Sequence, residues 1–102
     1  MNFFTINNQI NFFVPKNKNF IYDTNRNINL LLKTVNGKIF NIKVNLDNFV
    51  SEIKNELFKL DKKFNFYNNK IILLYKNKIL EDFYYINYYN LENNSIILII
   101  KE

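Results

Sequence analysis

Residues 28–45, with the sequence INLLLKTVNGKIFNIKVN, decide the fold class of this chain. Large apolar residues occupy alternate positions on both sides of Asn36-Gly37. These positions are Ile28, Leu30, Leu32, Phe40, Ile42 and Val44. Alternation with a period of two is typical of a strand with one buried face, and Asn-Gly favours a tight turn because glycine adopts positive φ without a steric penalty. The stretch therefore predicts a β-hairpin with one apolar and one polar face.

A helix is predicted directly after this hairpin. Apolar residues recur there at spacings of three and four, at Val50, Ile53, Leu57 and Leu60. Such spacing places them on one stripe of an amphipathic helix. Asp47-Asn48 precedes the stripe, so we expect a side chain there to cap the first turn. The helix is expected to fade near residues 61–63.

The remaining residues predict three more strands. Residues 71–75 form a short apolar strand, and residues 79–80 form a brief one after a turn. Residues 81–94 are polar and aromatic, and one short helical turn is expected around residues 85–89. The continuous apolar run in residues 95–101 favours a final central strand that is buried on both faces. This order predicts an α+β roll, in which a hairpin packs on one helix and the last strand is inserted centrally.

Residues 1–27 differ in composition from the rest, and we interpret them as an N-terminal extension of a domain at residues 28–102. Asparagine is dense there, and Pro15 interrupts the middle. Two alternatives stay open, namely a flexible extension or an additional edge strand at residues 9–14 or 20–23. The segment lacks the basic start of a signal peptide, and no run of about 18 apolar residues predicts a membrane span.

The composition excludes several kinds of chemistry. The chain has no Cys and no His, so it lacks disulfides, thiolate nucleophiles and the usual general base near neutral pH. Its single Gly excludes a glycine-rich phosphate loop. Glu81-Asp82 is the only adjacent pair of carboxylates, and adjacent residues rarely converge on one substrate. We therefore expect no catalytic activity, no cofactor and no metal, whereas the net charge of +5 permits contacts with nucleic-acid phosphates.

From Ile28 to its end, the chain resembles ubiquitin and its relatives, the β-grasp family. Short segments carry this resemblance in the same order and spacing, apart from a longer loop at residues 61–70. They are Leu32-Lys33-Thr34 with Asn36-Gly37-Lys38 in the first hairpin, Ile53-Lys54 in the helix, Leu80-Glu81-Asp82 after the fourth strand, and Tyr89-Asn90-Leu91 with Ser95 before the last strand. The resemblance implies a ubiquitin-like β-grasp roll.

The resemblance also implies where a partner would bind. One exposed apolar patch on the family's sheet is recognised by partner proteins. Its positions correspond here to Val35, Leu74, Leu98 and Ile100. Alternation supports outward side chains at Leu74 and Ile100, because their neighbours Leu73 and Ile99 are expected to point into the core. The expected function is a non-covalent protein-interaction module whose partner recognises this surface.

Two further features of the family concern covalent attachment. Lysines lie at positions that resemble the chain-linking lysines of ubiquitin, namely Lys33, Lys38, Lys54 and Lys78. Conjugated modifiers end in a flexible Gly-Gly tail, whereas this sequence has no Gly after Gly37 and stops at Lys101-Glu102. The sequence as given therefore predicts a domain that is not conjugated to other proteins.

RNA binding is a second function class. Asn36-Gly37, the segment at residues 50–54 and the doubled tyrosine of Tyr88-Tyr89-Asn90-Leu91 resemble the ubiquitin-like domain of the splicing factor 3a large subunit, which binds RNA in the spliceosome. The RNA contacts expected under this alternative are Lys62, Lys63, Lys70, Lys76, Tyr88 and Tyr89, with the tyrosine rings as stacking platforms. A third alternative is a fixed subunit of a larger complex. An intracellular location, in the cytoplasm or the nucleus, is favoured.

Overall fold

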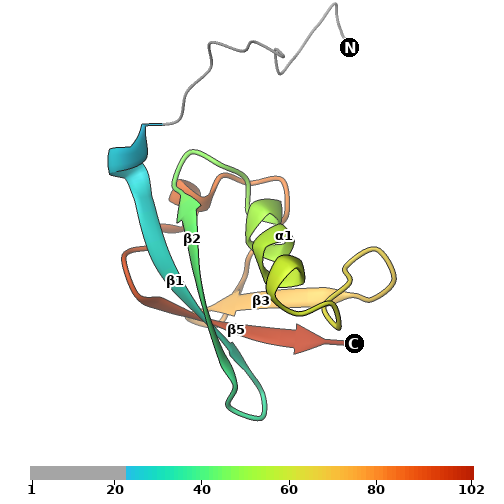
Figure 1. Ribbon diagram of the computed structural model, residues 1–102. Helices are drawn as coiled ribbons and strands as arrows, with labels where there is room; N and C mark the ends of the chain where they lie inside the picture. Colours follow the sequence, from blue (N-terminus) through green and yellow to red (C-terminus); the bar gives the residue numbers. More distant parts are fainter. Residues whose placement is uncertain (1–22) are drawn as a thin grey trace, which may run out of the picture.

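The computed structural model describes residues 23–102, and its order of elements is that of an α+β roll (Figure 1). The strands are β1 (Asn27–Thr34), β2 (Ile39–Asn45), β3 (Ile71–Tyr75), β4 (Lys78–Ile79) and β5 (Ser95–Lys101). One α-helix, α1 (Ser51–Leu60), lies between β2 and β3 in the chain, and two 3₁₀ turns are η2 (Thr24–Arg26) and η3 (Ile86–Tyr89). The predicted hairpin, helix, short strands and final strand are therefore confirmed, although β4 comprises Lys78–Ile79 rather than residues 79–80.

The five strands form one mixed sheet in the order β2-β1-β5-β3-β4. β1 pairs with β5 in parallel, whereas the other neighbours are antiparallel. The last strand therefore lies in the centre of the sheet, as its apolar run predicts. Because β1 and β5 are far apart in sequence, this central pairing joins the two ends of the domain.

The turn of the first hairpin has the geometry that Asn36-Gly37 predicts. The Lys38 carbonyl accepts a hydrogen bond of 2.8 Å from the Thr34 amide, and the Gly37 amide donates one of 3.0 Å back to the Thr34 carbonyl. Gly37 has a φ of 94°, a conformation that L side chains rarely adopt. The only glycine of the chain thus lies where the turn requires positive φ.

The core lies between α1 and the inner face of the sheet. Leu30 and Leu32 of β1, Ile53 and Leu57 of α1, and Ile97 of β5 are all fully buried. In the strands the buried residues alternate with more exposed ones, so one face of the sheet faces α1 and the other faces outward. Burial of these large side chains is the main stabilising contribution in a domain of this size.

The prediction that β5 is buried on both faces is wrong. Ile97 and Ile99 are buried, but Ile96 is 58% exposed, and Leu98 and Ile100 are only half-buried. The reason is that α1 packs against one face of the sheet (Figure 1). A continuous apolar run therefore indicated a central strand correctly but not what covers its outer face.

The predicted cap of α1 is also wrong. Asn48 Oδ1 accepts a hydrogen bond from the adjacent Phe49 amide, and Asp47 instead binds Arg26. The helix follows Val50, which makes no side-chain cap. The Val50 amide donates to the Tyr84 carbonyl and the Ser51 amide to the Asp82 carbonyl, so a distant segment satisfies these two amides at the start of the helix. The last member of the apolar stripe, Leu60, is 56% exposed where the helix ends.

The N-terminal interpretation rests largely on residues outside the described part of the chain. Two edge strands were predicted as alternatives. The one at residues 9–14 lies entirely outside the described residues, and the one at residues 20–23 lies outside them except for Asp23. The domain boundary between residues 27 and 28 stays a prediction, although the described residues 24–26 form η2 directly before β1. No helix within residues 23–102 is long and apolar enough to cross a membrane.

Candidate functional site

The outer face of the sheet carries a row of side chains that crosses all five strands. The registers between neighbouring strands place one residue of each strand in this row. From β2 to β4 these are Ile39, Lys33, Leu98, Leu74 and Ile79. Four of the five are apolar, and residues paired in register on one face are neighbours that contact each other. The predicted pair Leu74 and Leu98 therefore lies at the centre of a continuous surface.

A second row lies beside the first. Ile100 of β5 pairs with Ile72 of β3, and continuing the β1–β5 register by one residue places Val35 beside Ile100. Val35 lies in the hairpin turn and is 78% exposed. We call the apolar outward side chains of β3, β4 and β5, together with Val35 of the turn, the outer-face patch. It comprises Val35, Ile72, Leu74, Ile79, Ile96, Leu98 and Ile100.

The sequence identified four of these residues and missed three. Ile96 was missed, although it points to the same face of β5 as Leu98 and Ile100. The alternation of apolar residues along this strand was sufficient to predict it. Ile72 has the same parity as Leu74 in β3, so the same signal applied to it. Ile79 joins the patch only because β4 pairs with β3, and the two-residue length of β4 leaves no alternation to count.

The charge on the outer face has one sign. Lys33 and Lys43 are exposed at outward positions of β1 and β2, and no outward strand position in the described chain carries Asp or Glu. Lys33 lies within the first row, between Ile39 and Leu98. The outer face thus combines apolar side chains with positive charge.

The four lysines at ubiquitin-like linkage positions have different surroundings. Lys33 is exposed on the outer face, and Lys78 is exposed on β4. Lys38 lies 3.7 Å from the Asp61 carboxylate and over the ring of Phe40. Lys54 differs, because its side chain is only 12% exposed and forms a 2.8 Å ion pair with Asp82. Its environment is that of a structural ion pair rather than of a freely accessible amine.

The structure separates the lysines and tyrosines of the RNA alternative. Lys62 and Lys63 follow the C-terminal end of α1, whereas Tyr88 and Tyr89 lie in η3, beside the N-terminal end of that helix. Ten residues of helix span about 15 Å, so the two groups lie near opposite ends of α1. Lys70 precedes β3 and Lys76 follows it, so they lie at its opposite ends. RNA contacts at these residues stay a prediction.

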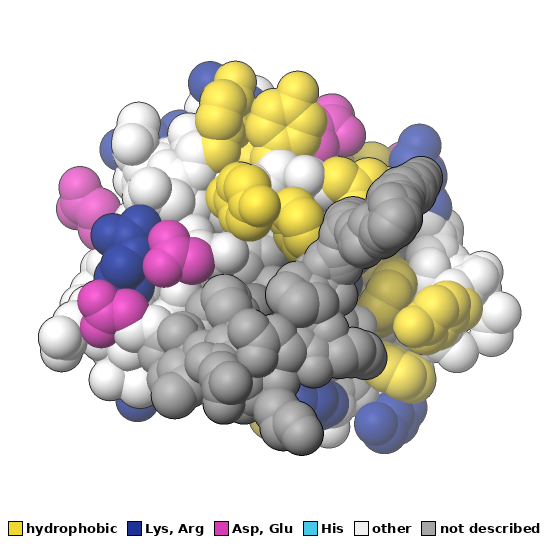
Figure 2. All heavy atoms as spheres, turned by 90° about the horizontal axis from the view of Figure 1, so that it is seen from above, with side chains coloured by type: hydrophobic (Ala, Val, Ile, Leu, Met, Phe, Trp, Pro, Cys, Tyr) yellow, Lys and Arg dark blue, Asp and Glu magenta, His cyan; other side chains and the backbone are white. Residues whose placement is uncertain are grey.

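Aromatic rings gather beside the start of α1. The rings of Phe49 and Tyr85 stack with centroids 4.8 Å apart, and Tyr84 contacts Tyr88 edge to face at 4.8 Å. Tyr88 is 63% exposed, and Tyr89 packs against the core with its hydroxyl accepting a hydrogen bond from the Glu81 amide. Figure 2, a view onto this end of the domain, shows exposed hydrophobic side chains in groups. We call Phe49, Phe83, Tyr84, Tyr85 and Tyr88 the aromatic surface.

Two carboxyl groups have shifted pKa values. Partial burial raises the pKa of Glu52 in the first turn of α1. The pKa of Asp61 is lowered, chiefly because its carboxylate accepts a hydrogen bond from the Lys63 amide and also because Lys38 is near. Asp61 lines a cavity of about 210 Å³ together with Lys38 and Lys63. Within residues 23–102, no cluster of three or more acidic side chains is arranged to hold a metal ion.

Comparison with protein families gives one match. The model of the ubiquitin family matches residues 30–102, a stretch that begins within β1 and includes α1 and the other four strands. A comparison with curated proteins finds no match. The matched stretch contains every residue of the outer-face patch.

Proposed function

The chain belongs to the ubiquitin family, and from this premise we propose that it binds a partner protein non-covalently through the outer-face patch. A ubiquitin-like domain is in general a protein-interaction module. What we propose beyond this general role is the surface that binds the partner and the chemistry of that contact.

The continuity of the apolar surface carries this proposal. Val35, Ile79 and Ile96 are each more than half exposed, and Leu74 and Leu98 join them across paired strands. Large contiguous apolar patches are uncommon on the surfaces of monomeric proteins and often mark interaction sites. The outer face has such a patch on three adjacent strands and the hairpin turn.

The charge next to the patch indicates the chemistry of the partner. Lys33 lies in the same row as Leu98, and outward strand positions carry lysines without carboxylates. A partner with an apolar centre and a carboxylate opposite Lys33 would complement both features. Complementary charge of this kind increases specificity and the association rate more than it increases affinity.

Chemical-shift mapping with a panel of ubiquitin-binding domains tests the proposal. A partner that uses the patch is expected to shift the amide signals of Val35, Leu74, Leu98 and Ile100. Leu98→Thr removes apolar contact area but keeps a residue that suits a strand, so about tenfold weaker binding is expected. Tyr88→Ser, on the aromatic surface, is the matched control and should bind as the wild type does. The proposal fails if no domain shifts these signals, or if Leu98→Thr binds unchanged.

Two assays separate the alternative functions from this proposal. RNA binding predicts that a stem-loop RNA is retarded in a gel at low salt and released as the salt concentration rises. A fixed subunit predicts that the native protein elutes as part of a large complex in size-exclusion chromatography. A third outcome is a partner that binds the wild type but not Leu98→Thr, while the native protein does not elute in a large complex. This outcome would favour a free interaction module over RNA binding and over a fixed subunit.

A further inference from the structure

A groove on the aromatic surface is separate from the outer-face patch. It has a volume of about 460 Å³ and is lined by Leu46, Asp47, Tyr85, Asn87 and Tyr88. Its two sides are joined by backbone hydrogen bonds, since the Asn87 amide donates to the Leu46 carbonyl at 3.0 Å. The groove therefore has fixed walls, and two exposed tyrosine rings contribute to them.

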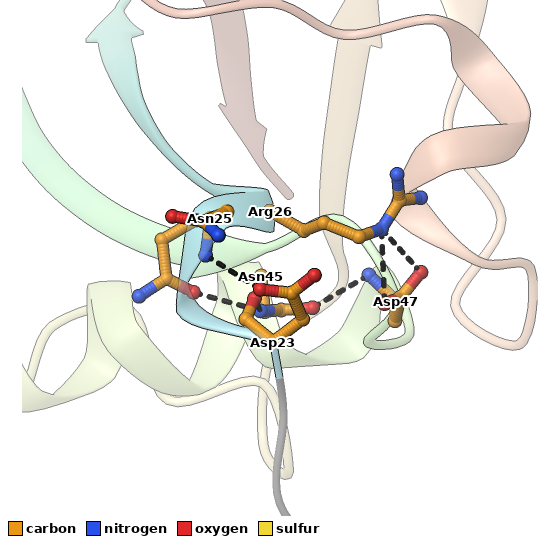
Figure 3. Close-up of polar contacts among 6 residues, drawn as sticks. Asp23, Asn25, Arg26, Asn45 and Asp47 are labelled. Carbon is orange, nitrogen blue, oxygen red and sulfur yellow. Dashed lines mark hydrogen bonds and ion pairs between the residues drawn. The ribbon is translucent and has the colours of Figure 1, made fainter.

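The described part of the chain begins at Asp23, which lies close to Asn45 and to Asp47 of the groove wall (Figure 3). Asn45 Nδ2 donates a 2.9 Å hydrogen bond to the Asp23 carbonyl, and Asn45 Oδ1 accepts one of 2.9 Å from the Asp47 amide. Arg26 Nε contacts both carboxylate oxygens of Asp47 at 3.0 Å. One asparagine side chain thus connects Asp23 to Asp47, a residue of the groove wall.

The residues that immediately precede Asp23 have the side chains that an aromatic groove accommodates. The sequence there is Phe20-Ile21-Tyr22, three large apolar residues in succession. An extended chain advances at most about 3.3–3.6 Å per residue, so three residues cover about 10 Å from their anchor. This reach is sufficient for the groove, because only the Asn45 side chain separates Asp23 from Asp47 in the groove wall.

We propose that Phe20-Ile21-Tyr22 of the same chain occupies the groove between Asp47 and Tyr88. Tethering at Asp23 makes this association intramolecular, so the local concentration of the segment is far above that of any free partner. It would also remove three large apolar side chains and the exposed tyrosine rings from water. The inference concerns a different surface from the outer-face patch and does not depend on the proposed function.

Amide spectra of the full-length protein test this contact. Phe20→Ser with Ile21→Ser is expected to shift the signals of Leu46, Asp47, Asn87 and Tyr88. Phe12→Ser with Phe13→Ser is the matched control, because it removes two large apolar residues from a more distant part of the same segment. The control should leave the four groove signals unchanged. Signals of Leu74 and Leu98 report whether each variant remains folded.

Tyrosine nitration of the unmodified chain gives an independent measurement. Tyr88 and Tyr67 are 63% and 79% exposed within the described residues, so they should react at similar rates if nothing covers Tyr88. The proposal predicts that Tyr88 reacts severalfold more slowly than Tyr67, and that Phe20→Ser with Ile21→Ser removes most of this difference. Equal rates in the native chain would overturn it. So would groove signals that change with protein concentration, because they would indicate a second copy as the occupant.

Discussion

Replacing Asn45 with alanine is expected to destabilise the domain by about 2–3 kcal/mol. Asn45, at the end of β2, is 6% exposed and is the one buried polar residue among residues 23–102. Its amide nitrogen donates to the Asp23 carbonyl at 2.9 Å and to Asn27 Oδ1 at 2.8 Å, and its oxygen accepts from the Asp47 amide at 2.9 Å. The side chain therefore joins the segment at residues 23–27 to the segment at residues 45–47 (Figure 3).

The magnitude follows from these three hydrogen bonds. Each contributes about 0.5–1.5 kcal/mol net, so their sum is about 1.5–4.5 kcal/mol. Asp23 is exposed and Asn27 is half-buried, so water partly replaces the lost partner there, and the lower part of this range is expected. The Asp47 amide loses its acceptor in the variant. A cost of about 2 kcal/mol is a large fraction of the stability of a small domain.

Urea unfolding followed by circular dichroism measures this cost in the full-length chain. Asn41→Ala is the matched control, because Asn41 is an exposed asparagine at an outward position of the same strand. The control should change the free energy of unfolding by less than about 0.5 kcal/mol. If Asn45→Ala costs no more than Asn41→Ala, the reasoning from the three hydrogen bonds is refuted.

Three further predictions concern single interactions elsewhere in the domain. Because Gly37 has a φ of 94°, Gly37→Ala should lower the free energy of unfolding in urea by about 1–2 kcal/mol. Gly37→Asn should lower it less, since Asn tolerates positive φ, and equal costs for the two variants would contradict this reasoning. Lys54→Met should cost about 2 kcal/mol because it leaves the Asp82 carboxylate without its 2.8 Å partner, whereas the double variant with Asp82→Leu should recover most of that loss in the same assay. Because the pKa of Asp61 is lower in the folded state, the ionised carboxylate stabilises the fold. This stability is fully present above the ordinary carboxyl pKa of about 4, and it is lost as the pH falls through the lower pKa of the folded state. Asp61→Asn should therefore reduce the acid dependence of the melting temperature, and an unchanged dependence would rule out this contribution.

Local sequence patterns were sufficient for the hairpin and for α1. Asn36-Gly37 required a turn with positive φ, and the spacing of apolar residues from Val50 to Leu57 required a helix with one buried stripe. The features that sequence reasoning missed depend on contacts between distant segments. The carbonyls of Asp82 and Tyr84 accept hydrogen bonds from the Ser51 and Val50 amides at the start of α1, and no local pattern near Asp47 or Asn48 indicates this.

The same distinction applies to the candidate site. Alternation and the family resemblance together located Leu74, Leu98 and Ile100 on the outer face, and the strand registers bring the first two into direct pairing. The grouping of Tyr85 and Tyr88 around a groove could not be predicted, because it depends on how an irregular segment folds against β2 and α1. The sequence shows that tyrosines are frequent in this segment, but it does not show how their rings are arranged in space.

The outer-face patch is not a requirement of the sheet itself. β2 belongs to the same sheet, and its outward positions include Asn41 and Lys43, so a strand of this fold is formed with polar outward residues. β5 satisfies the core with Ile97 and Ile99 and still carries Ile96, Leu98 and Ile100 on the other face. Burial against α1 requires the inner residues to be apolar, whereas β2 shows that outward positions of this sheet can be polar. A partner that covers this face, as proposed above, would account for the apolar outer residues of β5.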